Sequence, residues 1–141
     1  MTDPQILEAI PHRKPMLLVD EIVEKEQDRI VCSKTFDDEE FFFQGHYPDF
    51  ALTPGVILCE CAVQAGAVLL SEMTKEAGGV PVLTRLSDVR FKNMVRPGQT
   101  ILSEVKIDEV VSNAFYCSAK VTCEGKLAVR FSFACAVAPK E

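Results

Sequence analysis

The sequence has no tryptophan and only two histidines, and its acidic residues outnumber its basic ones. A formal net charge of −6 argues against a general nucleic-acid-binding protein. The six cysteines show no C-x-x-C spacing, and two histidines offer few partners for them, so no metal site is expected. We expect the cysteines to be reduced thiols in the core of a cytoplasmic protein.

Long apolar runs are also scarce. The longest, residues 56–70, is somewhat short for a membrane span and carries Glu60 and Gln64, so a buried core helix is the better interpretation. The N-terminus has no basic, apolar leader, so no secretory signal is expected. With 141 residues of ordinary globular composition, residues 1–141 are expected to form one domain.

The apolar pattern predicts one long helix and several antiparallel strands. The helix begins at Pro54-Gly55 and ends near Glu76, before two glycines. Apolar residues on nearly every face indicate that other elements surround it. A short helix is predicted from Pro4 to about Ile10. Strands are predicted over residues 16–23, 29–36, 80–91, 100–111, 115–123 and 127–137. This is an α+β layout with an antiparallel sheet around a central helix.

His46 and Glu60 are the most informative pair of residues. His46 lies in a turn-rich loop, and Glu60 is the only charged residue between Gly55 and Leu70. A helix start leaves backbone N–H groups unsatisfied at the positive end of the helix dipole, and Gly55 allows a ligand to approach that backbone closely. His46 is a candidate base near neutral pH.

The protonation state of Glu60 is left open by the sequence. An apolar surrounding favours the neutral carboxyl, which could act as an acid, whereas the nearby helix N-terminus favours the ionised form. Gln64 lies one turn further along the same face and could hydrogen-bond this carboxyl. A base, an oxyanion donor and an acid suit the elimination of water from a 3-hydroxyacyl thioester. Both side chains also have a structural interpretation, Glu60 as a satisfied core group and His46 as a loop anchor.

At these residues the sequence resembles the (3R)-hydroxyacyl-acyl-carrier-protein dehydratases of type II fatty-acid synthesis, which have the hot-dog fold. The matching segments are residues 11–20 (PHRKPMLLVD), 42–48 (FFQGHYP), 54–64 (PGVILCECAVQ), and 90–92 (RFK) with 96–99 (RPGQ). Their order and the gaps between them match the family, and the resemblance as a whole covers nearly the whole chain. The segment from His46 to Glu60 is the most specific. The remaining strands carry little family information.

The resemblance implies that His46 is the catalytic base, that Glu60 is the acid, and that the Gly55 N–H polarises the thioester carbonyl. Val56 and Gln64 are then expected in the substrate site. The substrate is expected on an acyl carrier protein, and no cofactor is implied. In such enzymes one site takes its histidine and its carboxylate from different subunits of a dimer, and three dimers commonly form a hexamer. The basic run Arg90, Lys92 and Arg96 is expected either to dock the acidic carrier or to be ordinary solvated charge.

The sequence departs from the family beside the expected entrance of the site. Asp49-Phe50-Ala51 stands where Gly-Arg-Pro is usual, and Thr53 stands where methionine is common. These changes concern substrate preference and carrier docking more than the elimination itself. Two other functions stay open, a thioesterase on the same fold and a non-catalytic acyl-binding subunit. The loop around His46 favours the dehydratase, and the presence of both His46 and Glu60 argues against a non-catalytic role.

Overall fold

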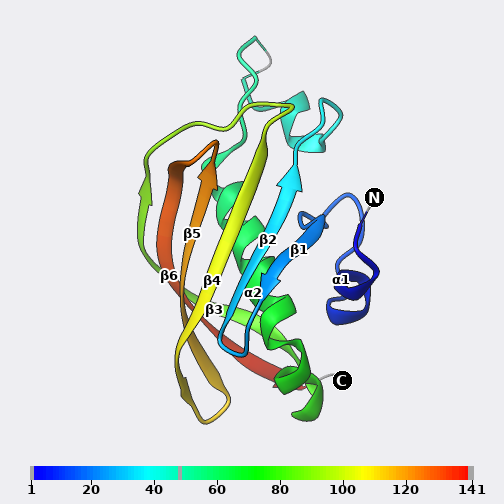
Figure 1. Cartoon of the computed structure of the whole chain (residues 1–141), viewed down its shortest axis with the longest axis vertical. Helices are drawn as coiled ribbons and strands as arrows, with labels where there is room; N and C mark the ends of the chain where they lie inside the picture. The colour runs from blue at the N-terminus through cyan, green and yellow to red at the C-terminus, as the bar shows by residue number, and fades with distance from the viewer. Residues whose placement is uncertain (1, 48, 140–141) are drawn as a thin grey trace.

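The computed structural model describes residues 2–47 and 49–139 and contains one long helix packed on an antiparallel sheet. The helix, α2 (Gly55–Glu76), runs along the length of the strands behind the sheet (Figure 1). The sheet has six strands in the order β1-β2-β4-β5-β6-β3, and all neighbours are antiparallel. The expected α+β layout is therefore confirmed. Pro48, part of the predicted histidine loop, lies outside the described residues.

Most predicted elements are found at their expected positions. The short helix is α1 (Pro4–Ala9), and Asp3 caps it by accepting a hydrogen bond from the Gln5 N–H. The strands are β1 (Glu21–Lys25), β2 (Arg29–Thr35), β3 (Gly79–Phe91), β4 (Thr100–Val111), β5 (Ala114–Cys123) and β6 (Lys126–Pro139). Glu124 and Gly125 both have positive φ angles, of 52° and 78°, as a two-residue hairpin turn between β5 and β6 requires.

The prediction was wrong over residues 16–20, which are not part of a strand. The Leu18 N–H donates to Oε1 of the Gln64 side chain, and the Met16 carbonyl accepts from Nε2 of the same side chain. A polar group on α2 thus takes the backbone bonds that a neighbouring strand would have made. The alternation of apolar residues alone could not distinguish these two outcomes.

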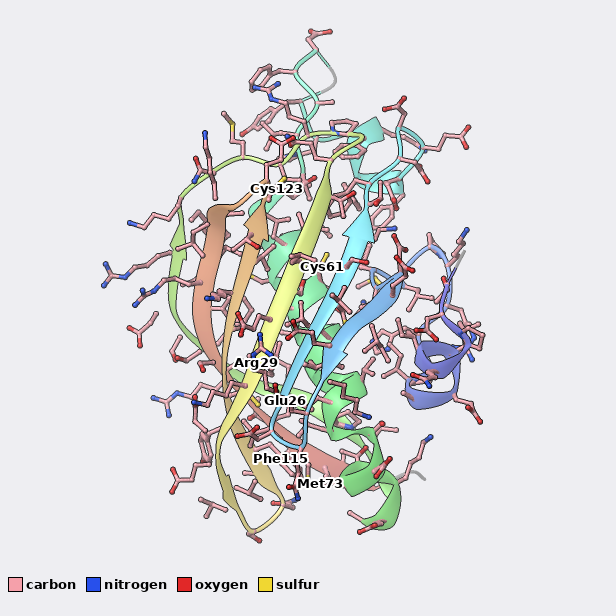
Figure 2. All side chains as sticks on the ribbon, in the orientation of Figure 1. Glu26, Arg29, Cys61, Met73, Phe115 and Cys123 are labelled. Atoms are coloured by element: carbon pink, nitrogen blue, oxygen red, sulfur yellow. The ribbon has the colours of Figure 1, made fainter. Side chains whose placement is uncertain are left out.

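The core lies between α2 and the inner face of the sheet. Of the most apolar window of α2, 67% is buried, so this helix is a core helix although its composition would suit a membrane span. All six cysteines are free and buried, as expected. Burial raises the pKa of Cys32 and Cys117 to about 12 and that of Cys135 to about 11, so these thiols are chemically inert. Figure 2 shows Cys61 on α2 behind the sheet.

The two edges of the sheet differ in character. The β1 edge is short, whereas β3 is long and, within the part of the chain that the structure describes, has no hydrogen-bonded strand on one side. On β3, Val82, Leu83 and Leu86 are each more than two fifths exposed. A long edge with exposed apolar side chains is a surface to which a further strand can add.

Candidate active site

The N-terminus of α2 carries backbone N–H groups that have no partner within the described residues. Pro54 is the N-cap residue and supplies no side-chain cap, and its carbonyl accepts from Ile57 and Leu58. The N–H groups of Gly55 and Val56 therefore stay available for an external acceptor, at the end of the helix where the dipole is positive. This is the arrangement that an oxyanion needs.

A side chain at position 55 would require the half-exposed ring of Phe91 to move. A Cβ atom there would lie 2.5 Å from Cε1 of Phe91, so the ring of this β3 residue rests directly on the start of α2. Phe91 is thus a wall of the candidate site, which the sequence analysis did not assign. Alternation along β3 could have shown it, because a residue between Arg90 and Lys92 faces the opposite side from both.

An open cavity of about 510 Å³ lies at this end of α2. It is lined mainly by apolar side chains and backbone, from Leu52, Thr53, Gly55, Val56, Leu58, Phe91, Lys92, Asn93 and Met94. The predicted binding residues Gly55 and Val56 are therefore side by side on its wall. Its size and its apolar lining suit a small acyl chain, with the free N–H groups of α2 at one side.

Glu60 is held in place by its own helix. The Gln64 side chain is fully buried and donates through Nε2 to Oε2 of Glu60 at 2.9 Å and to the Met16 carbonyl at 2.8 Å. Its Oε1 accepts from the Leu18 N–H at 2.8 Å. Three bonds leave Gln64 a single orientation, and that orientation in turn directs the Glu60 carboxyl. The predicted bond between the two side chains is confirmed.

His46 lies in the segment between the short helix η1 (Phe41–Gln44) and α2, which projects beyond the end of the sheet (Figure 1). Its Nδ1 lies 3.1 Å from the carbonyl oxygen of Leu52. A carbonyl can only accept, so Nδ1 must carry the proton, and Nε2 of the neutral ring then has a free lone pair. The ring also packs against that of Tyr47, with centroids 4.5 Å apart.

A buried ion pair supports the segment that leads to His46. Nζ of Lys34, on the inner face of β2, lies 2.9 Å from Oε2 of Glu40, and the exposed fraction of each side chain is only 11%. Glu40 is the residue before η1, and its carbonyl accepts from the Phe43 N–H. Removing either partner would leave an uncompensated buried charge, so this pair fixes the start of η1. The sequence analysis missed it, because Lys34 and Glu40 lie on different elements.

The structure brings some predicted site residues together and leaves others apart. The Glu60 carboxyl is hydrogen-bonded to Gln64, and both Gly55 and Val56 line the cavity. His46 is hydrogen-bonded to the carbonyl of Leu52, which lines the same cavity. Within the described residues, no hydrogen bond or ion pair joins His46 to Glu60.

The three basic residues predicted to dock a carrier have different surroundings. Lys92 lines the cavity at the start of α2, whereas Arg90 lines a different hollow on the sheet. The guanidinium of Arg96 lies over the ring of Phe50, 4.4 Å from its centroid. Phe50 is one of the residues that depart from the family pattern, so the departure supplies a new partner for Arg96.

Thr53, which stands where methionine is common in the family, is only 2% exposed. Its hydroxyl has no hydrogen-bond partner within the described residues. It is therefore a polar group beside an apolar cavity. Across residues 2–47 and 49–139, no group of His, Cys, Asp or Glu side chains could hold a metal ion.

Comparison with known proteins gives two kinds of match. The model of the FabA-like domain matches residues 10–132. The 3-hydroxyacyl-[acyl-carrier-protein] dehydratase FabZ of Staphylococcus carnosus is 42% identical over 125 residues, which cover 88% of this chain and 86% of that protein. The enzyme of the same name from Clostridium perfringens is 39% identical over 124 residues, covering 88% of this chain and 89% of its own.

Solved structures agree on the fold. A chain of the dehydratase heterocomplex ApeI:P from Xenorhabdus doucetiae superposes with a TM-score of 0.81 at 17% identity, covering 96% of this chain and 91% of that chain. The protein PH1136 from Pyrococcus horikoshii superposes with a TM-score of 0.67 at 22% identity, covering 91% and 89%. Together with the strand order, these matches confirm the expected hot-dog fold.

Proposed function

The chain belongs to the FabA-like family of 3-hydroxyacyl-[acyl-carrier-protein] dehydratases, and from this premise we propose that it eliminates water from a (3R)-3-hydroxyacyl group on acyl carrier protein. The product is the trans-2-enoyl thioester, as in fatty-acid biosynthesis. The observation that carries the proposal is the apolar cavity whose wall includes the Gly55 and Val56 backbone at the start of α2.

In the proposed reaction, Nε2 of His46 removes a proton from the carbon next to the thioester carbonyl. The negative charge that develops on the carbonyl oxygen is stabilised by the Gly55 N–H and the helix dipole. Glu60 then delivers a proton to the hydroxyl at the third carbon, the C–O bond breaks, and water leaves. The electron pair of the broken C–H bond becomes the new double bond.

The proton on Nδ1 of His46 supports this assignment. The bond to the Leu52 carbonyl leaves Nε2 as the basic nitrogen, which is the form of the ring that can accept a proton. The Gln64 amide donates to Oε2 of Glu60, which leaves Oε1 as the oxygen to carry and deliver the acidic proton. Gln64 therefore acts as a positioning residue, and Val56 as part of the acyl-binding wall.

The site is completed, in this proposal, by a second copy of the chain. No hydrogen bond or ion pair joins His46 to Glu60 within the described residues, and the exposed apolar edge of β3 offers a surface for edge-to-edge pairing. A homodimer would bring His46 of one copy to Glu60 of the other, and three such dimers would make the hexamer common in the family. Each subunit is proposed to be one domain, in a reducing compartment such as the cytoplasm, where its six buried thiols stay free.

Lys92 and Arg96 are proposed to guide the carrier-borne substrate to the cavity. Lys92 lies on the cavity wall, and Arg96 is held over Phe50 in the neighbouring loop. Local positive charge would offset the repulsion between an acidic carrier and a chain of net charge −6.

A direct test is incubation of the purified protein with 3-hydroxyacyl carrier protein and, separately, with the enoyl form. Intact mass spectrometry should show loss of water from the first and gain of water by the second. Loss of the whole acyl group instead would identify a thioesterase. Unchanged substrates in the presence of demonstrated binding would identify a non-catalytic acyl-binding subunit.

A further inference from the structure

The histidine loop, which we define as residues 46–47 and 49–53, is shaped by two internal hydrogen bonds. The Phe50 N–H donates to the Tyr47 carbonyl at 2.8 Å, and Nδ1 of His46 donates to the Leu52 carbonyl at 3.1 Å. Both bonds join residues of the same loop, so they shape it without attaching it to the rest of the fold. How firmly the His46 ring is held therefore depends on contacts between this loop and a second element.

That second element is the segment between β3 and β4, residues 92–99. It crosses the end of the sheet from which the histidine loop projects (Figure 1). The Val95 carbonyl accepts from the Thr53 N–H at 2.7 Å. The guanidinium of Arg96 lies over the ring of Phe50, 4.4 Å from its centroid. The first contact holds the end of the loop, and the second holds its middle.

Arg96 belongs to a turn that is tied to the core. The Arg96 N–H donates to Oε1 of Gln99 at 2.8 Å, and the Gln99 N–H donates to the Arg96 carbonyl at 3.2 Å. Gly98, whose φ angle is 87°, donates its N–H to the carbonyl of Phe36. The Phe36 N–H donates in return to the Gln99 carbonyl, and Phe36 is fully buried. The Arg96 side chain therefore meets the histidine loop from an anchored backbone.

The departures from the family at residues 49–51 make this contact particular to the present chain. Phe50 stands where the family usually has arginine, which would set two like charges together at Arg96. A guanidinium is instead attracted to the face of an aromatic ring. Ala51 stands where proline is usual, so the backbone here lacks the fixed φ angle of a proline. The histidine loop thus has one covalent restraint fewer and one side-chain contact more.

We propose that the contact between Phe50 and Arg96 positions His46, an inference that rests on the proposed function. The contact holds the middle of the histidine loop and so keeps the Leu52 carbonyl where Nδ1 of His46 can donate to it. That bond keeps the proton on Nδ1 and leaves Nε2 free to accept the α-proton of the substrate. Phe50 and Arg96 are thus positioning residues that act through His46. This role is separate from guidance of the carrier by the Arg96 charge.

Steady-state dehydration of a short soluble 3-hydroxyacyl thioester tests this role without a carrier. Phe50→Leu removes the aromatic face without adding charge, so kcat should fall about tenfold or more while KM changes by less than about twofold. Phe50→Tyr keeps the aromatic face and should stay near the wild-type kcat. Tyr116→Leu is the matched control, since it removes an exposed ring from β5, and its kcat should be unchanged.

Arg96→Gln is a second variant, which removes the cation from the same contact. On the soluble thioester its kcat should fall as it does in Phe50→Leu. The double variant should lose no more than either single variant, because both changes remove one shared interaction. A loss in Arg96→Gln that is confined to carrier-borne substrate would assign Arg96 to docking alone and overturn its positioning role.

The tautomer of His46 gives a readout that needs no turnover. The chain has only two histidines, so in protein that carries isotope-labelled histidine the ring signals of His46 are identified by their loss in His46→Ala. In nuclear magnetic resonance spectra at mildly alkaline pH, the wild-type ring should carry its proton on Nδ1. Phe50→Leu should move a measurable fraction of this proton to Nε2, whereas Phe50→Tyr should keep the wild-type pattern.

A folded Phe50→Leu with the wild-type kcat, or with the wild-type His46 tautomer, would overturn the proposal. An equal loss in Phe50→Tyr or in Tyr116→Leu would also overturn it, because the aromatic face over Arg96 would then not be the cause. Inactivity of the wild-type protein on both soluble and carrier-borne substrate would remove the proposed function. The His46 tautomer in Phe50→Leu would still decide whether this contact positions the ring.

Discussion

The two chemical groups of the candidate site are held in different ways. Glu60 lies within α2, and the buried Gln64 side chain joins its carboxyl to two backbone groups of residues 16–18. His46 lies in a projecting segment, with one hydrogen bond to Leu52 and a neighbour, Tyr47, whose φ angle is 53°. The comparison teaches that one chain holds the proposed acid, Glu60, in a single orientation but presents the proposed base, His46, at its periphery, where the proposed second subunit would complete the site.

The largest effects are expected from removing either group. Glu60→Gln keeps the size of the side chain but cannot donate an acidic proton, so dehydration should fall by about 10²–10⁴-fold with the fold retained. His46→Ala should cause a similar loss and should also abolish exchange of the α-proton with solvent. Glu72→Gln, at an exposed position of α2, is the matched control and should keep full activity. Wild-type rates in either site variant would exclude that residue from the chemistry.

Mixing the two inactive variants tests whether His46 and Glu60 of one site come from different subunits. If one site combines His46 of one subunit with Glu60 of its partner, a mixed dimer contains one intact site and one doubly altered site. Activity should then recover in part after subunit exchange, up to about half for each mixed dimer. Exchange demonstrated by native mass spectrometry without any recovery would place both groups in a site of the same subunit.

The part of the site around Glu60, which the Gln64 side chain holds in place, should contribute more to stability than the part around His46. Gln64→Met leaves the Leu18 N–H and the Met16 carbonyl without partners in the core, which should lower the free energy of unfolding by about 2–4 kcal/mol. Urea denaturation measures this change. Gln27→Met, in the exposed turn between β1 and β2, should change it by less than about 0.5 kcal/mol. Equal effects of the two substitutions would mean that the Gln64 network contributes no stability.

Alkaline pH should weaken the core that supports Glu60. Burial raises the pKa of Cys32 and Cys117 from 9.0 to about 12, so these thiols stay protonated in the folded chain while the unfolded chain loses its protons. Their contribution to stability is complete below pH 9 and is lost as the pH rises towards 12. Denaturation midpoints across this range should fall, and they should fall less in a Cys32→Ala, Cys117→Ala variant. A flat profile in the wild-type chain would contradict the burial of these thiols.

The smallest expected effect concerns Tyr47, the neighbour of His46. Tyr47 has a positive φ angle, which asparagine tolerates better than an aromatic residue, so Tyr47→Asn should raise the unfolding free energy by about 0.5 kcal/mol or leave it unchanged. It also removes the ring beside His46, so turnover should drop by severalfold. Tyr116→Asn, on β5, should instead lower stability because asparagine is unfavourable in strands. Comparable destabilisation by both would argue against strain at Tyr47.

Local sequence was sufficient to predict most of the elements. Pro54-Gly55 marks the start of α2, Gly78-Gly79 begins two residues after its end, and Glu124-Gly125 marks the turn between β5 and β6. These residues act on the backbone at their own positions. The prediction failed at residues 16–20, where a distant glutamine competes for the backbone groups. It also missed η1 and the Lys34–Glu40 pair, which depend on contacts across the fold.

In the candidate site, too, contacts within one helix could be predicted from the sequence, whereas contacts between elements could not. The bond between Gln64 and Glu60 was predictable, since residues four apart on a helix lie on one face. The packing of Phe91 on Gly55 and the scattering of Arg90, Lys92 and Arg96 over three surroundings were not. Their positions depend on how β3 passes the start of α2.

The sequence by itself determined where most of the elements begin and end, which helix is buried, and which groups are candidates for base, acid and oxyanion donor. Those properties follow from local backbone preferences, from the period of the apolar residues and from side-chain chemistry. Only the tertiary structure decided which nitrogen of His46 is free and that Phe91 forms a wall of the cavity. It also decided that Arg90, Arg130 and Lys120 lie opposite one another on three neighbouring strands. These depend on the register of the strands and on the packing of the sheet against α2, which join residues far apart in the chain.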